Sequence, residues 1–329
     1  MGEDYRMTWR GLMLDSGRQY QSVGYIESLL DAMAERSMNV FHWHLTETDG
    51  WRMEINRYPR LTEVGALVAD GAEQQGFYTR EDMLHIVSYA AERGIAVVPE
   101  IDLPGHSGAL IAAYPDFGCS KEVICPAHPD LLDFLKGVID EMCDIFPSAY
   151  VHLGGDEVNQ SVWANCEACQ QLMKREGIVS EAALQVWFER QLIAYLATKG
   201  RKVILWEDVL YETDEPLADN VVIQWWNYRS KGELGLREAL RRGIPVICSS
   251  NYYCYLNFPE TPWAGYGKER TCTADDIELR NPSHLLFDAS KPLMLDMEAC
   301  LWTDYNLTQD MLNQRLFPRL NILARQMRE

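Results

Sequence analysis

The chain has 329 residues, 47% of them hydrophobic and 24% charged, which allows one large domain or two small ones. Its formal net charge of -19 argues against nucleic acid or an anionic membrane surface as a partner, because both attract basic proteins, and it favours a neutral substrate. No apolar run reaches the roughly 18 residues that a membrane-spanning helix needs, and the first residues lack the apolar stretch of a signal peptide.

Short apolar runs and longer amphipathic stretches alternate along the whole chain, without a linker or low-complexity tract between them. This alternation predicts successive βα units. Gly94, Gly200 and Gly243 each follow a helical stretch and precede an apolar run, as helix C-terminal caps do. The predicted strands span residues 9–14, 39–45, 96–101, 150–153, 203–206, 221–225, 245–248 and 294–302. The predicted helices span about 22–37, 80–93, 130–145, 180–199, 230–242 and 308–325, and the segments after the third and seventh strands are less regular.

Eight parallel strands in this length favour a single (β/α)8 TIM barrel of the α/β class over residues 1–329. A doubly wound sheet is the alternative, but its glycine-rich nucleotide-binding signature is missing. Functional residues of a barrel lie at the C-terminal ends of its strands. Nearly every predicted strand ends in a polar or aromatic residue suited to a polyhydroxylated ring, namely Asp15, Arg18, His44, Glu47, Glu100, Asp102, His106, Asp156, Glu157, Trp206, Glu207, Trp225, Trp226, Trp302, Asp304 and the residues from Asn251 to Asn257.

Asp156 and Glu157 stand directly after a glycine pair at the end of a predicted strand. The glycines allow a sharp turn that exposes the next side chains. Adjacent carboxylates repel, so one of them tends to have a raised pKa and to keep the proton that a general acid needs. An ordinary acidic loop is the competing interpretation of such a pair. Aromatic residues are also abundant, with 10 Trp and 16 Tyr, and they fit either the core or stacking on sugar faces.

The nine cysteines cannot all pair within the chain. Cys166 and Cys169 have the spacing of a metal knuckle, and Cys119 and Cys125 precede them in a long loop. The four thiols could bind one structural zinc ion, form disulfides or remain buried thiols. The odd count and the missing leader favour a reducing compartment, and hence a cytoplasmic location.

The sequence resembles the family-20 glycoside hydrolases, the β-N-acetylhexosaminidases, over most of its length. The order and spacing of several motifs carry the resemblance. They are RGLMLD at 10–15 with Arg18, HWHLT at 42–46, PEIDLPGH at 99–106, HLGGDE at 152–157, WE at 206–207, QWW at 224–226, YLN at 255–257 and LWTD at 301–304.

The resemblance implies a retaining hydrolysis in which the 2-acetamido group of the substrate is the nucleophile. It assigns Glu157 as the general acid and base, and Asp156 as the acceptor of a hydrogen bond from the acetamido N–H. Tyr255 would donate its hydroxyl to the acetamido oxygen. No cofactor is required for this chemistry, and the partner is an oligosaccharide or glycoconjugate whose terminal N-acetylglucosamine is removed.

The same resemblance implies how the sugar is held. Arg18 would bind the hydroxyls at carbons 3 and 4 through its planar donors. Walls of tryptophan would exclude water, and His106 would stand between Glu47 and Glu157 to tune the acid. Three positions depart from the family pattern, which usually has Asp at 47, often Asp at 257 and usually Glu at 304. The substrate-binding residues are therefore predicted to be Arg18, Glu47, His106, Trp206, Trp225, Asn257, Trp302 and Asp304.

The departures at Asn257 and Asp304 predict an altered choice at carbons 4 and 6, so that N-acetylgalactosamine or a 6-substituted sugar are further candidates. Many relatives carry a small α/β domain before the barrel, which is expected to be absent because the first strand begins so early. Three other functions compete with the main one: a disaccharide-releasing enzyme, an inactive glycan-binding module, and a metal-dependent hydrolase with His42, His44, His106 and His152 as ligands. We expect His152 to support the structure, and the barrel helices could pair two subunits.

Overall fold

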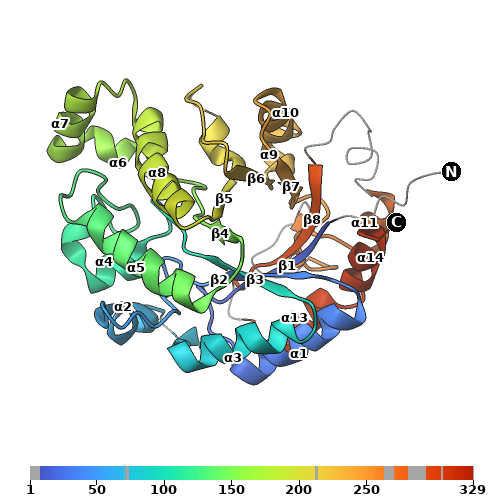
Figure 1. Cartoon of the computed structure of the whole chain (residues 1–329). Helices are drawn as coiled ribbons and strands as arrows, with labels where there is room; N and C mark the ends of the chain where they lie inside the picture. The colour runs from blue at the N-terminus through green and yellow to red at the C-terminus, as the bar shows by residue number, and fades with distance from the viewer. Residues whose placement is uncertain are drawn as a thin grey trace.

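A closed eight-stranded parallel barrel forms the centre of the molecule, with each strand paired to its neighbours in chain order and β8 closing onto β1 (Figure 1). The computed structural model describes residues 8–69, 71, 74–211, 214–262, 270–280, 294–304 and 307–328. Because the eight parallel strands close into one barrel, the predicted (β/α)8 TIM barrel is confirmed. Its strands are β1 (Trp9–Asp15), β2 (Val40–His44), β3 (Ala96–Glu100), β4 (Tyr150–His152), β5 (Lys202–Trp206), β6 (Val221–Trp225), β7 (Val246–Cys248) and β8 (Met294–Leu301).

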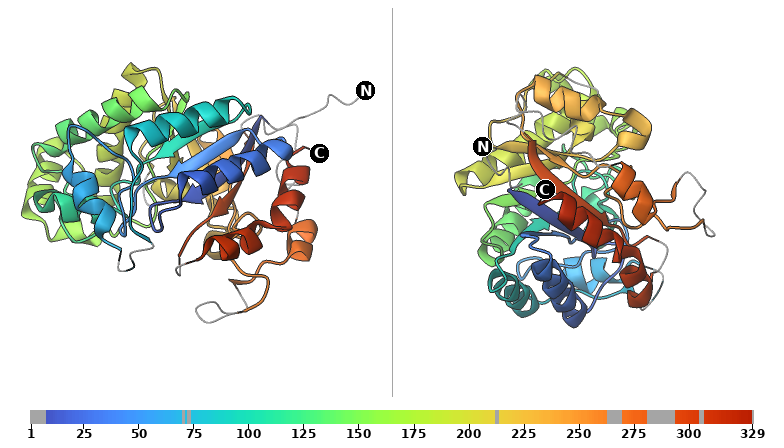
Figure 2. Two further views of the ribbon diagram at one scale, coloured as in Figure 1. Left: turned by 90° about the horizontal axis from the view of Figure 1, so that it is seen from below. Right: turned by 90° about the vertical axis from the view of Figure 1, so that its right-hand side faces the viewer.

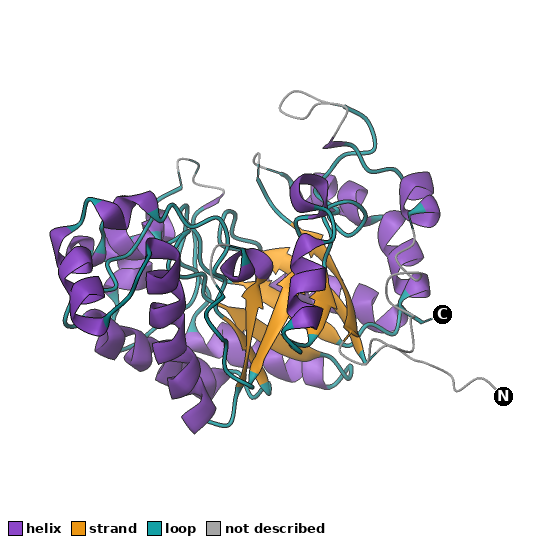
Figure 3. Ribbon diagram, turned by 90° about the horizontal axis from the view of Figure 1, so that it is seen from above, coloured by secondary structure: helices purple, strands orange, loops and turns teal. Residues whose placement is uncertain are grey.

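Helices surround the strands (Figure 3). Those described are α1 (Val23–Glu35), α2 (Arg60–Glu63), α3 (Arg80–Ala91), α4 (Gly108–Ala113), α5 (Leu131–Ile145), α6 (Ser161–Ala164), α7 (Glu167–Glu176), α8 (Glu181–Thr198), α9 (Tyr228–Lys231), α10 (Leu234–Arg241), α11 (Ala274–Leu279), α13 (Gln309–Leu316) and α14 (Arg319–Gln326). None of them, within the residues that the structure covers, is long and apolar enough to cross a membrane. Several begin at the polar residue that the sequence offers as a cap. Ser22 caps α1, Thr79 and Asp82 form a capping box on α3, and Ser180 caps α8.

Two predicted helices are interrupted. The stretch predicted at 308–325 is two helices, α13 and α14, because Pro318 has no backbone N–H to donate and its ring clashes with the preceding turn. The stretch predicted at 230–242 is broken at Gly232, which has a positive φ of 60°. Helices α11, α13 and α14 lie next to one another beside β8 and β1 (Figure 2).

The barrel interior is layered, because side chains alternate between the two faces of each strand. The layer nearest the N-terminal ends of the strands, called the lowest here, is apolar and contains Trp9, Val40, Val98, Ile204, Val222 and Ile247. Two residues further along the strands lies a polar layer that includes His42, Glu100, His152, Trp206, Gln224 and Glu298, all of them buried. The next inward positions lie at the C-terminal ends of the strands, where the site described below is formed.

Candidate active site

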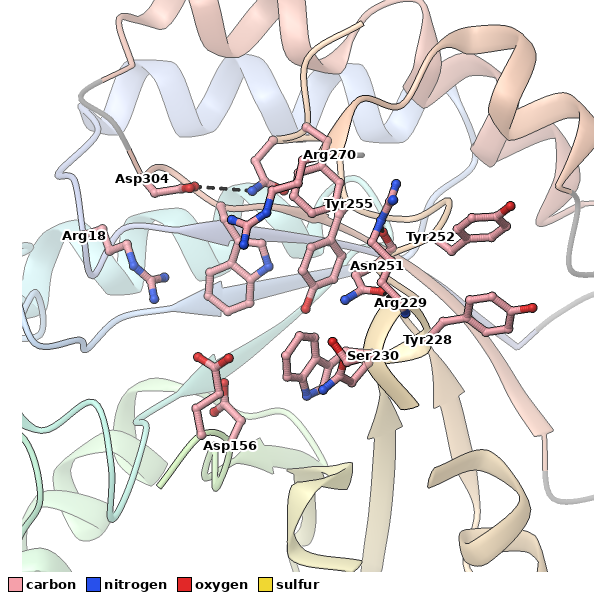
Figure 4. Close-up of a pocket in the computed structure, with 16 residues that line it drawn as sticks. Arg18, Asp156, Tyr228, Arg229, Ser230, Asn251, Tyr252, Tyr255, Arg270 and Asp304 are labelled. Atoms are coloured by element: carbon pink, nitrogen blue, oxygen red, sulfur yellow. Dashed lines mark hydrogen bonds between the residues drawn. The ribbon is translucent and has the colours of Figure 1, made fainter. Parts of the chain in front are cut away.

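A cavity of about 720 Å³ opens at the C-terminal ends of the strands (Figure 4). This is within the range of small-molecule sites. Its walls come from the segments after β1, β4, β6, β7 and β8, so residues far apart in the chain meet there. The lining residues are Arg18, Asp156, Glu157, Trp226, Asn227, Tyr228, Arg229, Ser230, Asn251, Tyr252, Tyr255, Asn257, Phe258, Arg270, Trp302 and Asp304.

The two acidic residues are carried by a strained turn after β4. Gly154 has a φ of 71°, and a Cβ atom there would lie 1.7 Å from Oδ1 of Asp102, so only glycine fits. Glu157 itself has a φ of 50°, which is unusual for a residue with a side chain. Such strain is typical of functional sites. The turn leaves the Asp156 side chain 12% exposed and that of Glu157 59% exposed at the cavity.

Burial raises the pKa of both carboxyl groups. The pKa of Asp156 is raised to about 6, with nearby Asp208 adding to the effect of burial and His106 opposing it. The pKa of Glu157 is raised first by burial and then by the negative charge of Asp156. The pair therefore titrates closer to neutrality than isolated carboxyl groups, as a general acid requires.

His106 connects this pair to a buried carboxylate. Its Nδ1 lies 2.7 Å from Oε1 of Glu47, and its Nε2 lies 3.7 Å from Asp156 Oδ2 and 3.8 Å from Glu157 Oε2. His106 thus lies between Glu47 and Glu157, where the sequence predicts it. Burial disfavours its charge, but Glu47 and Asp156 outweigh this and raise the pKa of His106 to about 10. A cation therefore faces the acidic pair at neutral pH.

Arg18 is held by two carboxylates behind the cavity wall. Its Nη1 lies 3.0 Å from Asp15 Oδ2, its Nη2 lies 2.5 Å from Glu47 Oε1, and its guanidinium lies over the Trp302 ring at 5.0 Å. Glu47 is only 2% exposed and does not line the cavity. The predicted substrate-binding residue Glu47 thus lies behind the cavity wall, where its carboxylate contacts Arg18 and His106.

Aromatic rings form the wall opposite Asp156. Tyr255 lies parallel to Trp226, with ring centroids 6.2 Å apart, and meets Trp302 at 6.1 Å. Its ring reaches into the cavity from the side facing Asp156 (Figure 4). Burial raises the pKa of Tyr255 well above its ordinary value, so its hydroxyl stays protonated as a hydrogen-bond donor.

The tryptophan that lines the cavity after β6 is Trp226, the neighbour of the predicted wall residue Trp225. Trp226 lines the cavity, whereas Trp225 is fully buried on the outer face of β6 against Tyr228. Alternation contains this information, because Gln224 points into the barrel and the residue two positions later shares its face. Trp206, also predicted as a wall, lies one layer lower, 1% exposed, and donates to Glu100 at 2.9 Å.

Asn257 and Asp304 meet at the cavity, with the Asn257 amide donating to Asp304 Oδ1 at 3.3 Å (Figure 4). The cations Arg229 and Arg270 also line the cavity and were not singled out from the sequence. Asp208 was missed as well, although it follows Trp206 and Glu207 at the end of β5. Its Oδ2 accepts from the Trp226 indole at 2.7 Å, and its Oδ1 accepts from the Glu157 backbone at 3.3 Å.

The histidines of β2 and β4 belong to a closed network beneath the cavity. His42 Nε2 lies 2.9 Å from Glu100 Oε2 and its Nδ1 lies 2.7 Å from Glu298, while His44 and His152 also contact Glu100. His42, Glu100 and His152 bring possible metal-ligand atoms within 4.8 Å of one another. All of them are buried and contact one another through Glu100, and they are absent from the cavity lining. The predicted supporting role of His152 agrees with this placement.

Fold and cavity together define a barrel enzyme with an acidic pair, a fixed arginine and aromatic walls. Residues 7–327 match the model of "Glycosyl hydrolase family 20, catalytic domain". The chain belongs to glycosyl hydrolase family 20, as its motifs predict.

Known proteins support this assignment. A β-hexosaminidase of Vibrio furnissii is 33% identical over 97% of this chain and 56% of its own length, and one of Porphyromonas gingivalis is 35% identical over 96% of this chain and 42% of its own length. The crystal structure of a β-N-acetylhexosaminidase from Bacteroides fragilis superposes with a TM-score of 0.94 at 49% identity, over 98% of this chain and 66% of that chain. The chain thus spans about half the length of these two curated relatives.

Proposed function

We propose that this domain is an exo-acting, retaining β-N-acetylhexosaminidase that releases terminal β-linked N-acetylglucosamine from the non-reducing end of an oligosaccharide or glycoconjugate. One observation carries the proposal. No N–H group of the described residues donates to Asp156 Oδ1, which is buried at the cavity, and the side chain paired with Asp156 is another carboxyl group, that of Asp102. A buried carboxylate oxygen calls for a donor, and the N–H of a 2-acetamido group on the bound sugar supplies one. A relative from Vibrio harveyi, 30% identical with a TM-score of 0.89, was crystallised with N-acetylglucosamine.

The acetamido group is the nucleophile in this proposal. Its carbonyl oxygen attacks carbon 1 of the sugar as the glycosidic bond breaks, and Glu157 gives its proton to the departing oxygen. The product of this step is a cyclic oxazolinium ion, with no covalent bond to the protein. Glu157, now a carboxylate, removes a proton from water, which attacks carbon 1 and reopens the ring. Two inversions restore the β configuration, and no metal or organic cofactor takes part.

Asp156 and Tyr255 hold the nucleophile from two sides. Asp156 accepts the acetamido N–H and balances the positive charge that develops on it. Tyr255, protonated and facing Asp156, donates to the acetamido oxygen. Holding a reacting group in place raises its effective concentration and can lower the activation free energy of the cleavage step by several kcal/mol.

The sugar ring is recognised by the remaining walls. Arg18, fixed by Asp15 and Glu47, presents its free edge to the hydroxyls at carbons 3 and 4. Trp226 and Trp302 offer apolar faces for the ring and the acetamido methyl group. Asn257 and Asp304 lie where carbons 4 and 6 would be selected. Because the Asn257 amide is directed to Asp304, we expect weak discrimination at carbon 4, with kcat/KM for the glucosamine and galactosamine forms within about ten-fold.

A second cavity of about 650 Å³ offers space for the leaving group next to Glu157. It shares Glu157 and Asn227 with the first cavity, and its lining includes polar residues such as Gln160, Gln185 and Lys231 beside Val158, Ala164 and Ala182. Glu157 therefore stands where two cavities meet, as an acid between a bound sugar and its leaving group should. A hydrophilic leaving group, such as the next sugar of a glycan, fits this lining.

The proposal is tested with Glu157→Gln on two substrates. With an N-acetylglucosaminide whose leaving group is a poor one, kcat should fall about 10²–10⁴-fold, because the departing oxygen is no longer protonated. With a dinitrophenyl leaving group, which needs no proton, the fall in the first step should be much smaller. Glu176→Gln, at an exposed carboxylate at the end of α7, is the matched control and should behave as the parent.

Three results would contradict the proposal. Equal losses on both substrates would remove Glu157 as the acid. Equally fast cleavage of the matching glycoside with a plain 2-hydroxyl would remove the acetamido nucleophile. Tight binding of N-acetylglucosamine without turnover of any N-acetylhexosaminide would identify a glycan-binding module instead. Parallel assays of the galactosaminide and a 6-sulfated substrate measure the selectivity at Asn257 and Asp304.

A further inference from the structure

Four cysteine sulfurs converge outside the cavity. Cys119 and Cys125 come from the loop between α4 and α5, while Cys166 and Cys169 lie at the start of α7. The Sγ atoms of Cys119 and Cys169 are 3.6 Å apart, those of Cys125 and Cys169 are 3.7 Å apart, and those of Cys125 and Cys166 are 3.9 Å apart. All four sulfurs lie within 4.8 Å of one another.

These separations match a tetrahedral metal site. Sulfurs at about 2.3 Å from one zinc ion are about 3.8 Å apart along the edges of a regular tetrahedron. Disulfide sulfurs lie about 2.0 Å apart, well below each of these three separations. We propose that Cys119, Cys125, Cys166 and Cys169 bind one structural Zn²⁺ ion as thiolates, with the four thiol protons released on binding.

The local backbone suits such a ligand set. Cys119 and Cys125 flank a tight turn in which the backbone N–H groups of Cys119 and Ser120 both donate to the Val123 carbonyl, at 2.9 and 3.2 Å. Cys166 is the N-cap residue of the ten-residue helix α7, and Cys169 lies in its first turn. The positive end of the helix dipole therefore faces the sulfurs and favours thiolates over thiols.

The surroundings shield the sulfurs from water. Cys125 and Cys169 are buried, and the cluster packs with Val123, Trp163, Leu172, Met173 and Leu184 in a small apolar core of its own. An ion joining four side chains from two segments would cross-link the loop after α4 to helix α7. Structural zinc sites stabilise folded domains in this way.

The site would tie together the two loops that carry the acidic machinery. The Ile124 backbone donates to the Pro104 carbonyl at 3.1 Å, two residues before His106. The Trp163 indole, a few residues after Glu157, donates to the Ile124 carbonyl at 3.0 Å. The zinc ion is thus proposed as a structural support for the loops of His106 and of Asp156 with Glu157, with no contact to the substrate.

Metal content of the purified protein tests the proposal independently of its catalytic activity. The chain is produced with added zinc, freed from loosely bound metal and analysed by mass spectrometry of metals, and we expect about one zinc per chain. The double variant C119S/C169S should lose the zinc, whereas Cys143→Ser, at a half-buried free cysteine outside the cluster, should retain it. Cobalt(II) in place of zinc should give the absorption bands of a tetrahedral thiolate site.

If the double variant does not fold, two measurements on the wild-type protein still test the proposal. Titration of the wild-type protein with a mercurial should release the zinc as the thiols react, and removal of zinc by a strong chelator should lower the melting temperature. Absence of zinc in the wild type would overturn the proposal, as would two disulfides found by non-reducing peptide mapping, or zinc retained at full stoichiometry in C119S/C169S. Because none of these readouts involves glycoside cleavage, they are separate from the test of the proposed function.

Discussion

Two layers of ionisable residues lie one above the other in this barrel, and they differ in how their charges are balanced. In the lower layer, Glu100 is completely buried, and burial alone would raise its pKa. His152, His44 and His42 surround it and hold that pKa well below the usual range. In the upper layer, Asp156 is nearly as buried but faces one histidine and other carboxylates, and its pKa is raised to about 6.

The contrast shows that burial does not by itself make a reactive carboxylate. The lower layer is closed, because the carboxylates of Glu100 and Glu298 are matched by histidines and by the Trp206, Trp9 and Gln224 side chains. The upper layer is open, since no N–H group in the part of the chain described donates to Asp156 Oδ1 and Glu157 is largely exposed. The proposed function assigns the chemistry to the open layer, and the closed layer lies beneath it as the floor of the cavity.

Glu100→Gln should break the closed layer and give the largest effect. Removing one partner of a buried ion pair leaves the other charge uncompensated, so the free energy of unfolding should fall by about 3–5 kcal/mol. Urea unfolding followed by circular dichroism measures this. Asp133→Asn, which removes an exposed pair with Lys136, is the control and should cost less than about 1 kcal/mol. A loss at Glu100 as small as that at Asp133 would contradict the closed-layer interpretation.

Asp156→Asn should damage the open layer without unfolding the protein. In the proposed mechanism the positive charge that develops on the acetamido group would lose its counter-charge, so kcat should fall about 10²–10³-fold, which corresponds to about 3–4 kcal/mol. Steady-state kinetics and a thermal melt separate activity from stability.

Asp102→Asn is a sharp control for this variant. Burial and the negative charge of Asp156 raise the pKa of Asp102 well above its ordinary value, which favours the neutral form of its carboxyl group. An amide therefore changes little of the local charge, and kcat should fall less than about ten-fold. Similar losses from the two substitutions would show that neither carboxyl group is distinguished by its protonation.

The barrel and most of the acidic site follow from the sequence because they depend on local patterns. Strand alternation, helix caps and the glycine pair before Asp156 are encoded in neighbouring residues. The resemblance names Trp225 as a wall residue, whereas its neighbour Trp226 lines the cavity, because one position along a strand changes the face on which a side chain lies. The position of Glu47 behind Arg18 depends on loop paths that no local pattern encodes. The spacing of Cys166 and Cys169 is a local pattern that suggests a cysteine cluster, but the approach of Cys119 and Cys125 depends on the fold.

The two adjacent tryptophans offer a direct test of that one-residue shift. Trp226→Phe removes cavity surface and the indole donor to Asp208, so kcat/KM should fall about ten-fold with the melting temperature little changed. Trp225→Phe removes buried volume outside the cavity, so the unfolding free energy should fall by about 1–2 kcal/mol with kcat/KM within two-fold. A larger loss of kcat/KM in Trp225→Phe than in Trp226→Phe would mean that Trp225, and not Trp226, contacts the substrate.

The smallest expected effect is a shift of the pH profile of kcat/KM. It tests how far the charge of His106 sets the pKa values of the two carboxyl groups in the upper layer. His106 has a pKa of about 10, so it is a cation near pH 7 and lowers the pKa of both Asp156 and Glu157. In His106→Gln both carboxyl pKa values should therefore rise. The proposed mechanism needs ionised Asp156 and protonated Glu157, so both limbs of the kcat/KM profile should move to higher pH, by roughly one unit.

His85→Gln is the matched control, because His85 is exposed and pairs with Glu27 at 2.6 Å on the outer surface. Its profile should coincide with that of the parent protein. A profile of His106→Gln that does not move, or that moves to lower pH, would mean that His106 does not set the protonation of the acidic pair. The upper layer would then owe its raised pKa values to burial and to mutual repulsion alone, and the histidine would only hold Glu47 in place behind Arg18.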